Sequence, residues 1–222
     1  MIVTVLMTVC YSCFFDAQEK NDDPFYLSDE IVIKMSTSEL VNAILERPLG
    51  KYHLMPWCFI CSNLNFPGVA EFNKELKESN IANELFKRND CFSVLTSKYQ
   101  NYTEETEEFN SFEFEFLAML LASDMCMAVI NENEKNQLME IALENKEYKD
   151  EPVNGSLQIM VAVMQSCGYT PFVEEIVPVL VETVFGYTFN NPDNDLIYTG
   201  LGGEYHSEII VKYATTFLID NK

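Results

Sequence analysis

Helix-start signals recur along this sequence, and they constrain the fold more than any other feature. The segment STSE at residues 36–39 is a capping box, in which the Ser36 hydroxyl and the Glu39 carboxylate each accept a backbone amide at the start of a helix. Leu40 and Ile44 follow with the 3.6-residue spacing of one helix face. The pattern predicts an amphipathic helix that buries that face.

Similar caps and apolar stripes predict a succession of short helices. Their expected starts are Ser28–Glu30, Pro67, Ser79, Asn89–Asp90, Ser111, Asn131 or Asn133, Ser156 and Pro171. Gly168 is expected to end the helix that begins at Ser156. The expected core positions include Val69, Phe72, Leu76, Ile81, Leu85, Phe86, Phe92, Leu95, Tyr99, Leu138, Ile141 and Ala142.

This succession predicts an all-α or mainly α fold. Two arrangements fit it: stacked short helical hairpins in an irregular solenoid, or a compact irregular helical domain. No repeat of fixed period is visible, so no named repeat class is indicated. We expect the helical domain to cover residues 27–187.

The last part of the chain, residues 188–222, has a different composition. NNPDND is a cluster of turn residues, and DLIYT and SEIIVKYATTFLI are rich in β-branched and aromatic residues. A glycine-rich GLGGEY separates these two runs. The pattern predicts a β-rich tail that contains a short C-terminal β-hairpin.

The first residues indicate export. MIVTVLMTVCYSCFF is apolar over a length that suits the core of a signal peptide and is too short for a confident membrane span. We therefore expect a leader at residues 1–17 and a polar tether at 18–26, although the basic residues that usually open a leader are missing. Two alternatives stay open: a lipid anchor on Cys13, and a buried N-terminal segment. No further membrane span is expected.

The charge balance restricts the partners. Asp and Glu number 35 against 14 Lys and Arg, which gives a formal net charge of −21. A field of this sign repels phosphate backbones and therefore argues against nucleic-acid binding. The Asp and Glu residues are spread along the chain, which predicts a solvated acidic surface. The alternative is an acidic face that binds a basic partner or a cation.

The segment WCFIC at residues 57–61 is the first candidate for chemistry. Cys58 and Cys61 have the spacing of a redox pair, but no βαβ pattern surrounds them. A metal site with His53 would have three ligands and no second cysteine pair. We favour two thiols on the apolar face of a helix, and keep the redox pair and the metal site as weaker alternatives.

His206 is the second candidate. A cysteine distant in sequence, such as Cys167 or Cys126, could pair with it in a hydrolase, because catalytic partners need not be neighbours in the chain. The sequence contains no G-x-S-x-G motif and no phosphate-binding loop. A histidine with a structural role is the simpler interpretation.

Three segments resemble an uncharacterised family of exported α-helical proteins from anaerobic Gram-negative gut bacteria. They are LSDEIVIKMSTSELVNAILERPL, ELFKRNDCFSVLTSKY and FEFEFLAMLLAS, within residues 27–150. The resemblance implies a helical fold and an exported location, and it assigns no catalytic residues. Some longer relatives continue into a Cys-His segment similar to papain-like hydrolases, but His206 has no cysteine beside it here.

The leading hypothesis is therefore an exported, non-enzymatic binding or scaffold module of the cell envelope, without a cofactor. Its partner would be a protein or a peptide, because grooves between stacked helices accept such ligands. The first alternative is a papain-like or degenerate hydrolase that uses His206. The weaker alternative is a thiol redox protein that uses Cys58 and Cys61.

Overall fold

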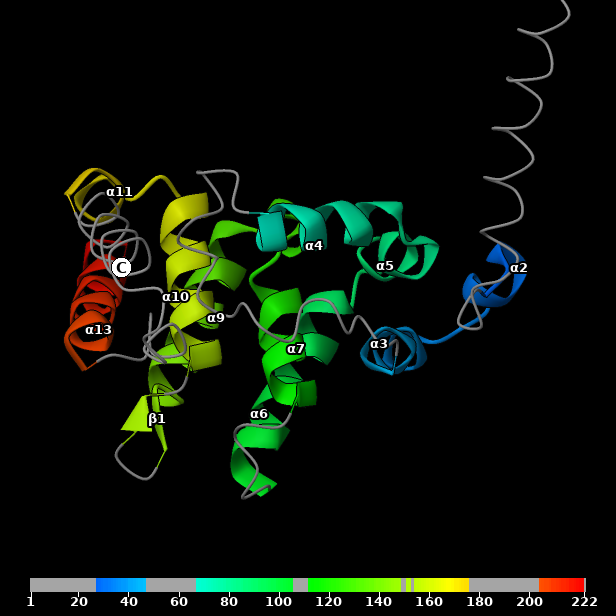
Figure 1. The fold of residues 1–222 in the computed structure, drawn as a ribbon, viewed down its shortest axis with the longest axis horizontal. Coiled ribbons are helices and arrows are strands. Elements are labelled where there is room, and N and C mark those ends of the chain that lie inside the picture. The colour runs from blue at the N-terminus through cyan, green and yellow to red at the C-terminus, as the bar shows by residue number, and fades with distance from the viewer. Residues whose placement is uncertain are drawn as a thin grey trace, which may run out of the picture.

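The computed structural model describes residues 27–46, 67–105, 112–148, 151–152, 154–175 and 204–221. This part of the chain is mainly α-helical, as predicted (Figure 1). The helices are α2 (Asp29–Val32), α3 (Thr37–Leu45), α4 (Pro67–Glu78), α5 (Asn80–Leu85), α6 (Cys91–Glu105), α7 (Phe112–Leu121), α8 (Asp124–Val129), α9 (Glu132–Glu144), α10 (Asn154–Ser166), α11 (Thr170–Glu175) and α13 (Glu204–Asp220). Two antiparallel two-residue strands, β1 (Glu147–Tyr148) and β2 (Glu151–Pro152), lie between α9 and α10.

Most described helices begin at or next to the predicted caps, but α10 begins at Asn154, two residues before the predicted Ser156. Ser36 and Glu39 form both bonds of a capping box, at 3.3 Å and 2.7 Å. Asn131 and Glu134 form a second box at the start of α9, at 3.1 Å and 2.8 Å, so Asn131 rather than Asn133 is the cap. Each cap accepts an amide that the first helical turn leaves unpaired, which fixes where the helix starts.

The short helix α8 is absent from the sequence-based expectation. Ser123 caps α8 by accepting the amide of Cys126 at 3.2 Å, and the Ser123 side chain is fully buried. With only six residues, α8 is too short to show a clear 3.6-residue pattern. Its contacts with α4 and α10 hold it in place.

Contacts between helices follow two rows. In the first row, α3 contacts α6, α6 contacts α9, and α9 contacts α13. In the second row, α4 contacts α8, α7 contacts α10, and α10 contacts α11. The rows pack on each other through α6 and α7, α9 and α10, and α10 and α13, and α5 packs against α3 and α4. Figure 1 shows the resulting order, from α2 at one end to α11 and α13 at the other.

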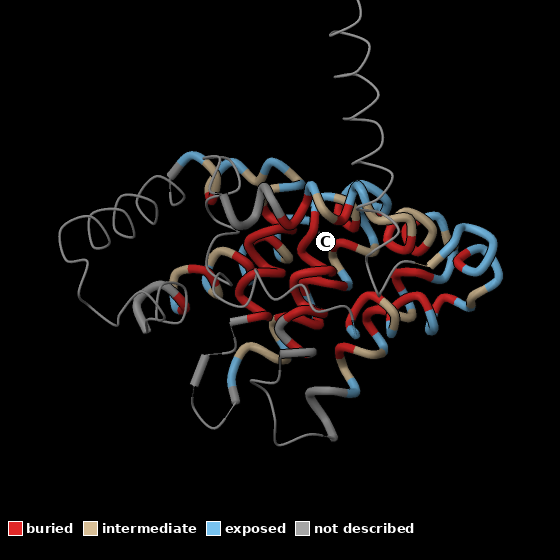
Figure 2. Tube along the Cα trace, turned by 45° about the vertical axis from the view of Figure 1, so that its right-hand side comes forward, coloured by how far each residue is buried: buried red, intermediate tan, exposed pale blue. Residues whose placement is uncertain are grey.

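The core is thickest around α7 and α10. Every residue from 155 to 164 of α10 is buried, because α7, α8, α9, α11 and α13 all contact this helix. Buried positions concentrate along the middle of the molecule in Figure 2. The predicted core positions Phe72, Leu85, Leu95 and Leu138 are fully buried. The side chain of Val69 lies outside the described part.

The predicted C-terminal β-hairpin is wrong over the residues that the structure describes. Residues 204–220, predicted as part of a β-rich tail, form the helix α13. Ser207, Ile210, Ala214 and Phe217 are buried on one face of α13, which packs against α9 and α10. This helical stripe outweighs the β propensity of individual residues, which depends strongly on context. DLIYT lies outside the described residues.

The expected leader, tether and lipid-acceptor Cys13 also lie outside the described residues. Among the helices that are described, none has the length and apolar character needed to cross a membrane.

Candidate functional site

Most of the residues predicted to carry chemistry lie outside the described part of the chain. His53, Cys58 and Cys61 are among them, so the core, redox and metal interpretations of WCFIC all stay predictions. His206 lies in α13, and its side chain is likewise outside the described part. Among the described residues, no group of three or more His, Cys, Asp and Glu side chains could hold a metal ion.

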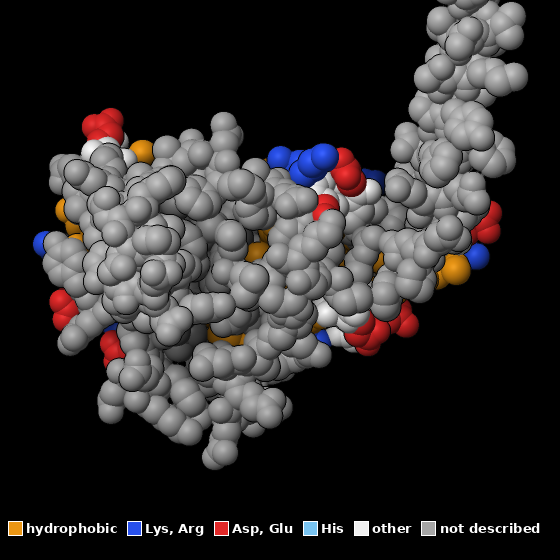
Figure 3. Space-filling view, in the orientation of Figure 1, with side chains coloured by type: hydrophobic (Ala, Val, Ile, Leu, Met, Phe, Trp, Pro, Cys, Tyr) orange, Lys and Arg blue, Asp and Glu red, His pale blue; other side chains and the backbone are white. Residues whose placement is uncertain are grey.

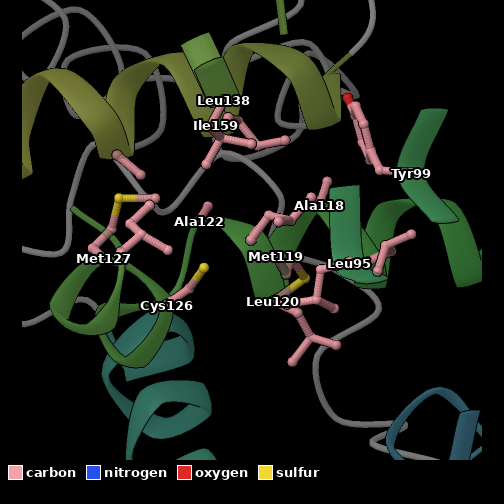
Figure 4. Close-up of a cluster of buried hydrophobic side chains, with 14 of the residues drawn as sticks. Leu95, Tyr99, Ala118, Met119, Leu120, Ala122, Cys126, Met127, Leu138 and Ile159 are labelled. Atoms are coloured by element: carbon pink, nitrogen blue, oxygen red, sulfur yellow. The ribbon is translucent and has the colours of Figure 1, made fainter. Parts of the chain in front are cut away.

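Cys126 is a packed core residue. Its side chain is 1% exposed and lies among aliphatic side chains from α6, α7, α9 and α10 (Figure 4). Burial raises the pKa of the Cys126 thiol strongly, and the nearby Cys91 and Glu134 raise it further. Burial, with a smaller contribution from Asp90, also raises the pKa of Cys91 to about 12. Both thiols therefore stay protonated at neutral pH, the unreactive form.

Cys167 belongs to a small cluster of polar side chains that the sequence spacing does not reveal. Its Sγ donates to Oε2 of Glu132 at 3.4 Å, and Nζ of Lys135 donates to Oε1 of the same carboxylate at 3.0 Å. Glu132 and Lys135 are three residues apart on α9, so the spacing alone indicates their pairing. Cys167 joins them because α10 packs along α9.

The electrostatics of this cluster hold the proton on sulfur. Burial raises the pKa of Cys167, and the hydrogen bond and charge of Glu132 raise it further, against weaker lowering by Lys135 and Ser166. The bond from Lys135, followed by that from Cys167, lowers the pKa of Glu132. An activated cysteine needs the opposite shift in its pKa. The cluster therefore links α9 to the end of α10 and lacks the activation of a nucleophile.

The exposed face of α9 is rich in carboxylates and amides. Its exposed residues are Glu132, Asn133, Gln137, Glu140 and Glu144. Lys135, the only basic residue of this helix, is buried with its side chain 9% exposed. The surface of α9 therefore combines carboxylates and amides, and α9 itself adds no exposed basic residue to it. We call this surface the acidic face.

Basic side chains occur elsewhere in the described part. Lys74 and Lys77 are exposed on α4, where Lys77 lies 3.5 Å from Asp124 and Lys74 lies 3.9 Å from Glu78. Figure 3 shows Lys and Arg side chains beside Asp and Glu at the upper edge of one face, with acidic groups around its margin. Positive charge on α4 is thus interspersed with acid, in contrast to the acidic face of α9.

No family model matches the chain, and comparisons with curated protein sequences and with solved structures give no match either. The resemblance to exported helical proteins therefore stays a prediction.

Proposed function

We propose that this protein is a non-enzymatic binding module that acts in the cell envelope after export. The single observation that carries the proposal is the acidic face of α9, which offers carboxylates and amides on a rigid helix. Its backbone is fixed by the Asn131 capping box and by packing against α10. A helix held in this way presents its exposed side chains in a constant arrangement.

The described thiols support a non-enzymatic role. Cys91 and Cys126 are buried, and Cys167 donates to Glu132, so burial and neighbouring acid raise the pKa of all three thiols. A hydrolase that used Cys126 or Cys167 would need a thiol with a lowered pKa. The hydrolase alternative consequently gains no support from either of these residues.

The arrangement of helices suits a binding role. We infer the stacked form of the fold, because α3, α6, α9 and α13 contact one another in sequence order along the first row. Stacks of helical hairpins bind peptides and proteins along the surface of one row. The acidic face belongs to the first row.

The charge of this face defines the partner. A partner segment rich in Lys or Arg would be attracted to the exposed carboxylates of α9, because the one basic residue of this helix is buried. The net charge of −21 adds long-range attraction to such a partner. Since exposed charges are screened by salt, we expect the affinity to fall as ionic strength rises.

Site-specific photo-crosslinking in the native host tests the proposal. A photo-reactive p-benzoylphenylalanine in place of Gln137 would probe the acidic face, and the same group in place of Lys74 on α4 would serve as the matched control. We expect a discrete protein adduct from position 137 that is absent from position 74. Substituting Glu140→Gln and Glu144→Gln should reduce this adduct.

Two results would contradict the binding role: no adduct from position 137, or the same adduct from both positions. Cell fractionation of the same cultures, with an intact mass for the recovered chain, tests the proposed location. An uncleaved chain found only in the cytoplasmic fraction would refute export without affecting the test of binding.

A further inference from the structure

Residues 27–35, here called the N-terminal strap, are attached to α5 and the turn after it largely through backbone groups. Nδ2 of Asn80 donates to the carbonyl oxygen of Leu27 at 2.9 Å, and Nη2 of Arg88 donates to that of Ile33 at 2.9 Å. Every residue in a chain carries such an acceptor. These contacts therefore recognise a short segment by its backbone, and another segment could supply them.

Two further bonds complete the polar attachment. Arg88 Nη2 also donates to the carbonyl oxygen of Met35 at 3.3 Å, and Asn80 Nδ2 donates to the side chain of Asp29 at 2.8 Å. Asp29 thus accepts through its side chain, whereas the other strap residues in these bonds accept through their carbonyl oxygens. Its carboxylate is the kind of group that many segments can provide.

The apolar attachment of the strap has one fully buried side chain. Val32 is 2% exposed, whereas its neighbours Ile31 and Ile33 are 51% and 61% exposed. The helix within the strap, α2, has four residues, and its cap Ser28 makes no side-chain cap bond. Short helices are unstable alone, so the strap depends on buried Val32, on the half-buried Leu27 and Met35, which pack against the core, and on the bonds from Asn80 and Arg88.

Arg88 has one donor that neither the strap nor Glu84 pairs. Nη2 of Arg88 pairs with Oε1 of Glu84 at 2.8 Å, but Nε of Arg88 is buried and has no hydrogen-bond partner among the described residues. A buried donor without a partner destabilises the state that contains it. One more acceptor within reach of this guanidinium would remove that cost.

We propose that the N-terminal strap is displaceable and that it covers a peptide-binding site formed by Asn80 and Arg88. The occupant is a short segment of a partner protein with an aliphatic side chain in the place of Val32. Its backbone carbonyls accept from Asn80 and Arg88. It also carries an additional acceptor, such as a carboxylate, for Nε of Arg88. This inference is independent of the acidic face of α9 and does not rest on its binding role.

Hydrogen exchange on the full-length protein tests whether the strap opens. We expect the amides of residues 31–35 to exchange at least about 100-fold faster than those of α7 and α10, because local opening releases few contacts. Exchange of these amides as slow as that of the core helices would overturn the proposal.

Peptide binding tests whether the uncovered site accepts a segment. The probe is a labelled synthetic peptide of residues 27–36, LSDEIVIKMS, and its control is a scrambled peptide of equal composition. In the full-length Val32→Asp variant the strap should be released while Asn80 and Arg88 stay in place. We expect the peptide to bind this variant at least about tenfold more tightly than the wild type, in which the strap competes.

Adding Asn80→Ala and Arg88→Gln to Val32→Asp should weaken peptide binding at least about tenfold, because both sets of backbone bonds are lost. Equal affinity for the wild type and for Val32→Asp, or no preference over the scrambled peptide, would overturn the proposal. If circular dichroism shows that Val32→Asp has lost its helices, hydrogen exchange of residues 31–35 in the wild type decides whether the proposal stands.

Discussion

The hydroxyl of Tyr99 lies 2.7 Å from Oγ of Ser156 and joins α6 to α10 inside the core. Ser156 donates its own hydrogen to the carbonyl oxygen of Asn145 at 2.7 Å, so Tyr99 is the donor in the first bond. The Tyr99 ring also stacks on Phe114, with centroids 4.9 Å apart. Burial raises the pKa of Tyr99, which keeps this donor protonated. The chain of bonds connects α6, α10 and the end of α9 without a charged group.

Removal of the Tyr99 hydroxyl tests this connection. Tyr99→Phe keeps the stacked ring and deletes one buried hydrogen bond, so we expect the free energy of unfolding to fall by about 1 kcal/mol. Ser156→Ala leaves both Tyr99 and the Asn145 carbonyl without their partner and should cost more, about 2 kcal/mol. Urea denaturation measures both values. Equal stability of Tyr99→Phe and wild type would show that the bond contributes nothing.

Gly155 allows α10 to approach α7 closely. A Cβ at this position would lie 2.8 Å from Cβ of Ala118, which requires a backbone shift. We expect Gly155→Ala to destabilise the protein by about 2 kcal/mol, although alanine is the better helix former. Thermal unfolding in the double variant with Ala118→Gly should recover part of this loss. No recovery would mean that the contact with Ala118 is not the cause.

Gly168 provides the comparison for Gly155. It has a φ of 60° at the end of α10, and a Cβ added there would meet nothing within 4 Å. Gly168→Ala should therefore cost about 1 kcal/mol through backbone strain alone, with no rescue by Ala118→Gly. Thermal unfolding of the single and double variants measures both effects, and a rescue would show that the two glycines are not independent.

Glu132 adds to the effect of burial in raising the pKa of Cys167. Glu132→Gln removes a carboxylate that raises the pKa of Cys167 and leaves Lys135, which lowers it. The thiol pKa should fall, so a larger fraction is thiolate at about pH 8 and alkylation is faster. The measurement is the rate of iodoacetamide labelling at Cys167, resolved from other cysteines by peptide mass. Glu144→Gln, on the same helix, should leave the rate unchanged, and an unaltered rate in Glu132→Gln would contradict the assignment.

Gln158 is a polar side chain in a fully buried position. It is 0% exposed on α10, and neither its Nε2 nor its Oε1 has a hydrogen-bond partner in the described part of the chain. Replacing an unpaired buried amide by an apolar side chain of similar shape removes its desolvation cost, so we expect Gln158→Met to raise the free energy of unfolding by about 1 kcal/mol. The same replacement at the exposed Gln137 of α9 should change stability by less than about 0.5 kcal/mol. Urea denaturation compares the two, and a less stable Gln158→Met variant would show that this amide is satisfied in solution.

Local signals in the sequence are sufficient to locate the starts of most described helices and the faces that they bury. Ser36, Ser79 and Asn131 bond to amides within three residues of themselves, and core positions such as Leu95 and Tyr99 repeat with the helical period. A cap and an amphipathic stripe are each complete within one helix. They can therefore be recognised without knowing what packs against them.

Packing between helices settles the state of residues 204–220 and the composition of the polar sites. Ile210 and Phe217 lie in a segment of high β propensity, but packing against α9 and α10 makes their helical spacing decisive. Cys167 meets Glu132, and Arg88 meets Ile33, across 35 and 55 residues of sequence. Neither contact follows from spacing, because each depends on how separate helices pack, and side-chain periodicity predicts which face is buried without specifying its neighbour.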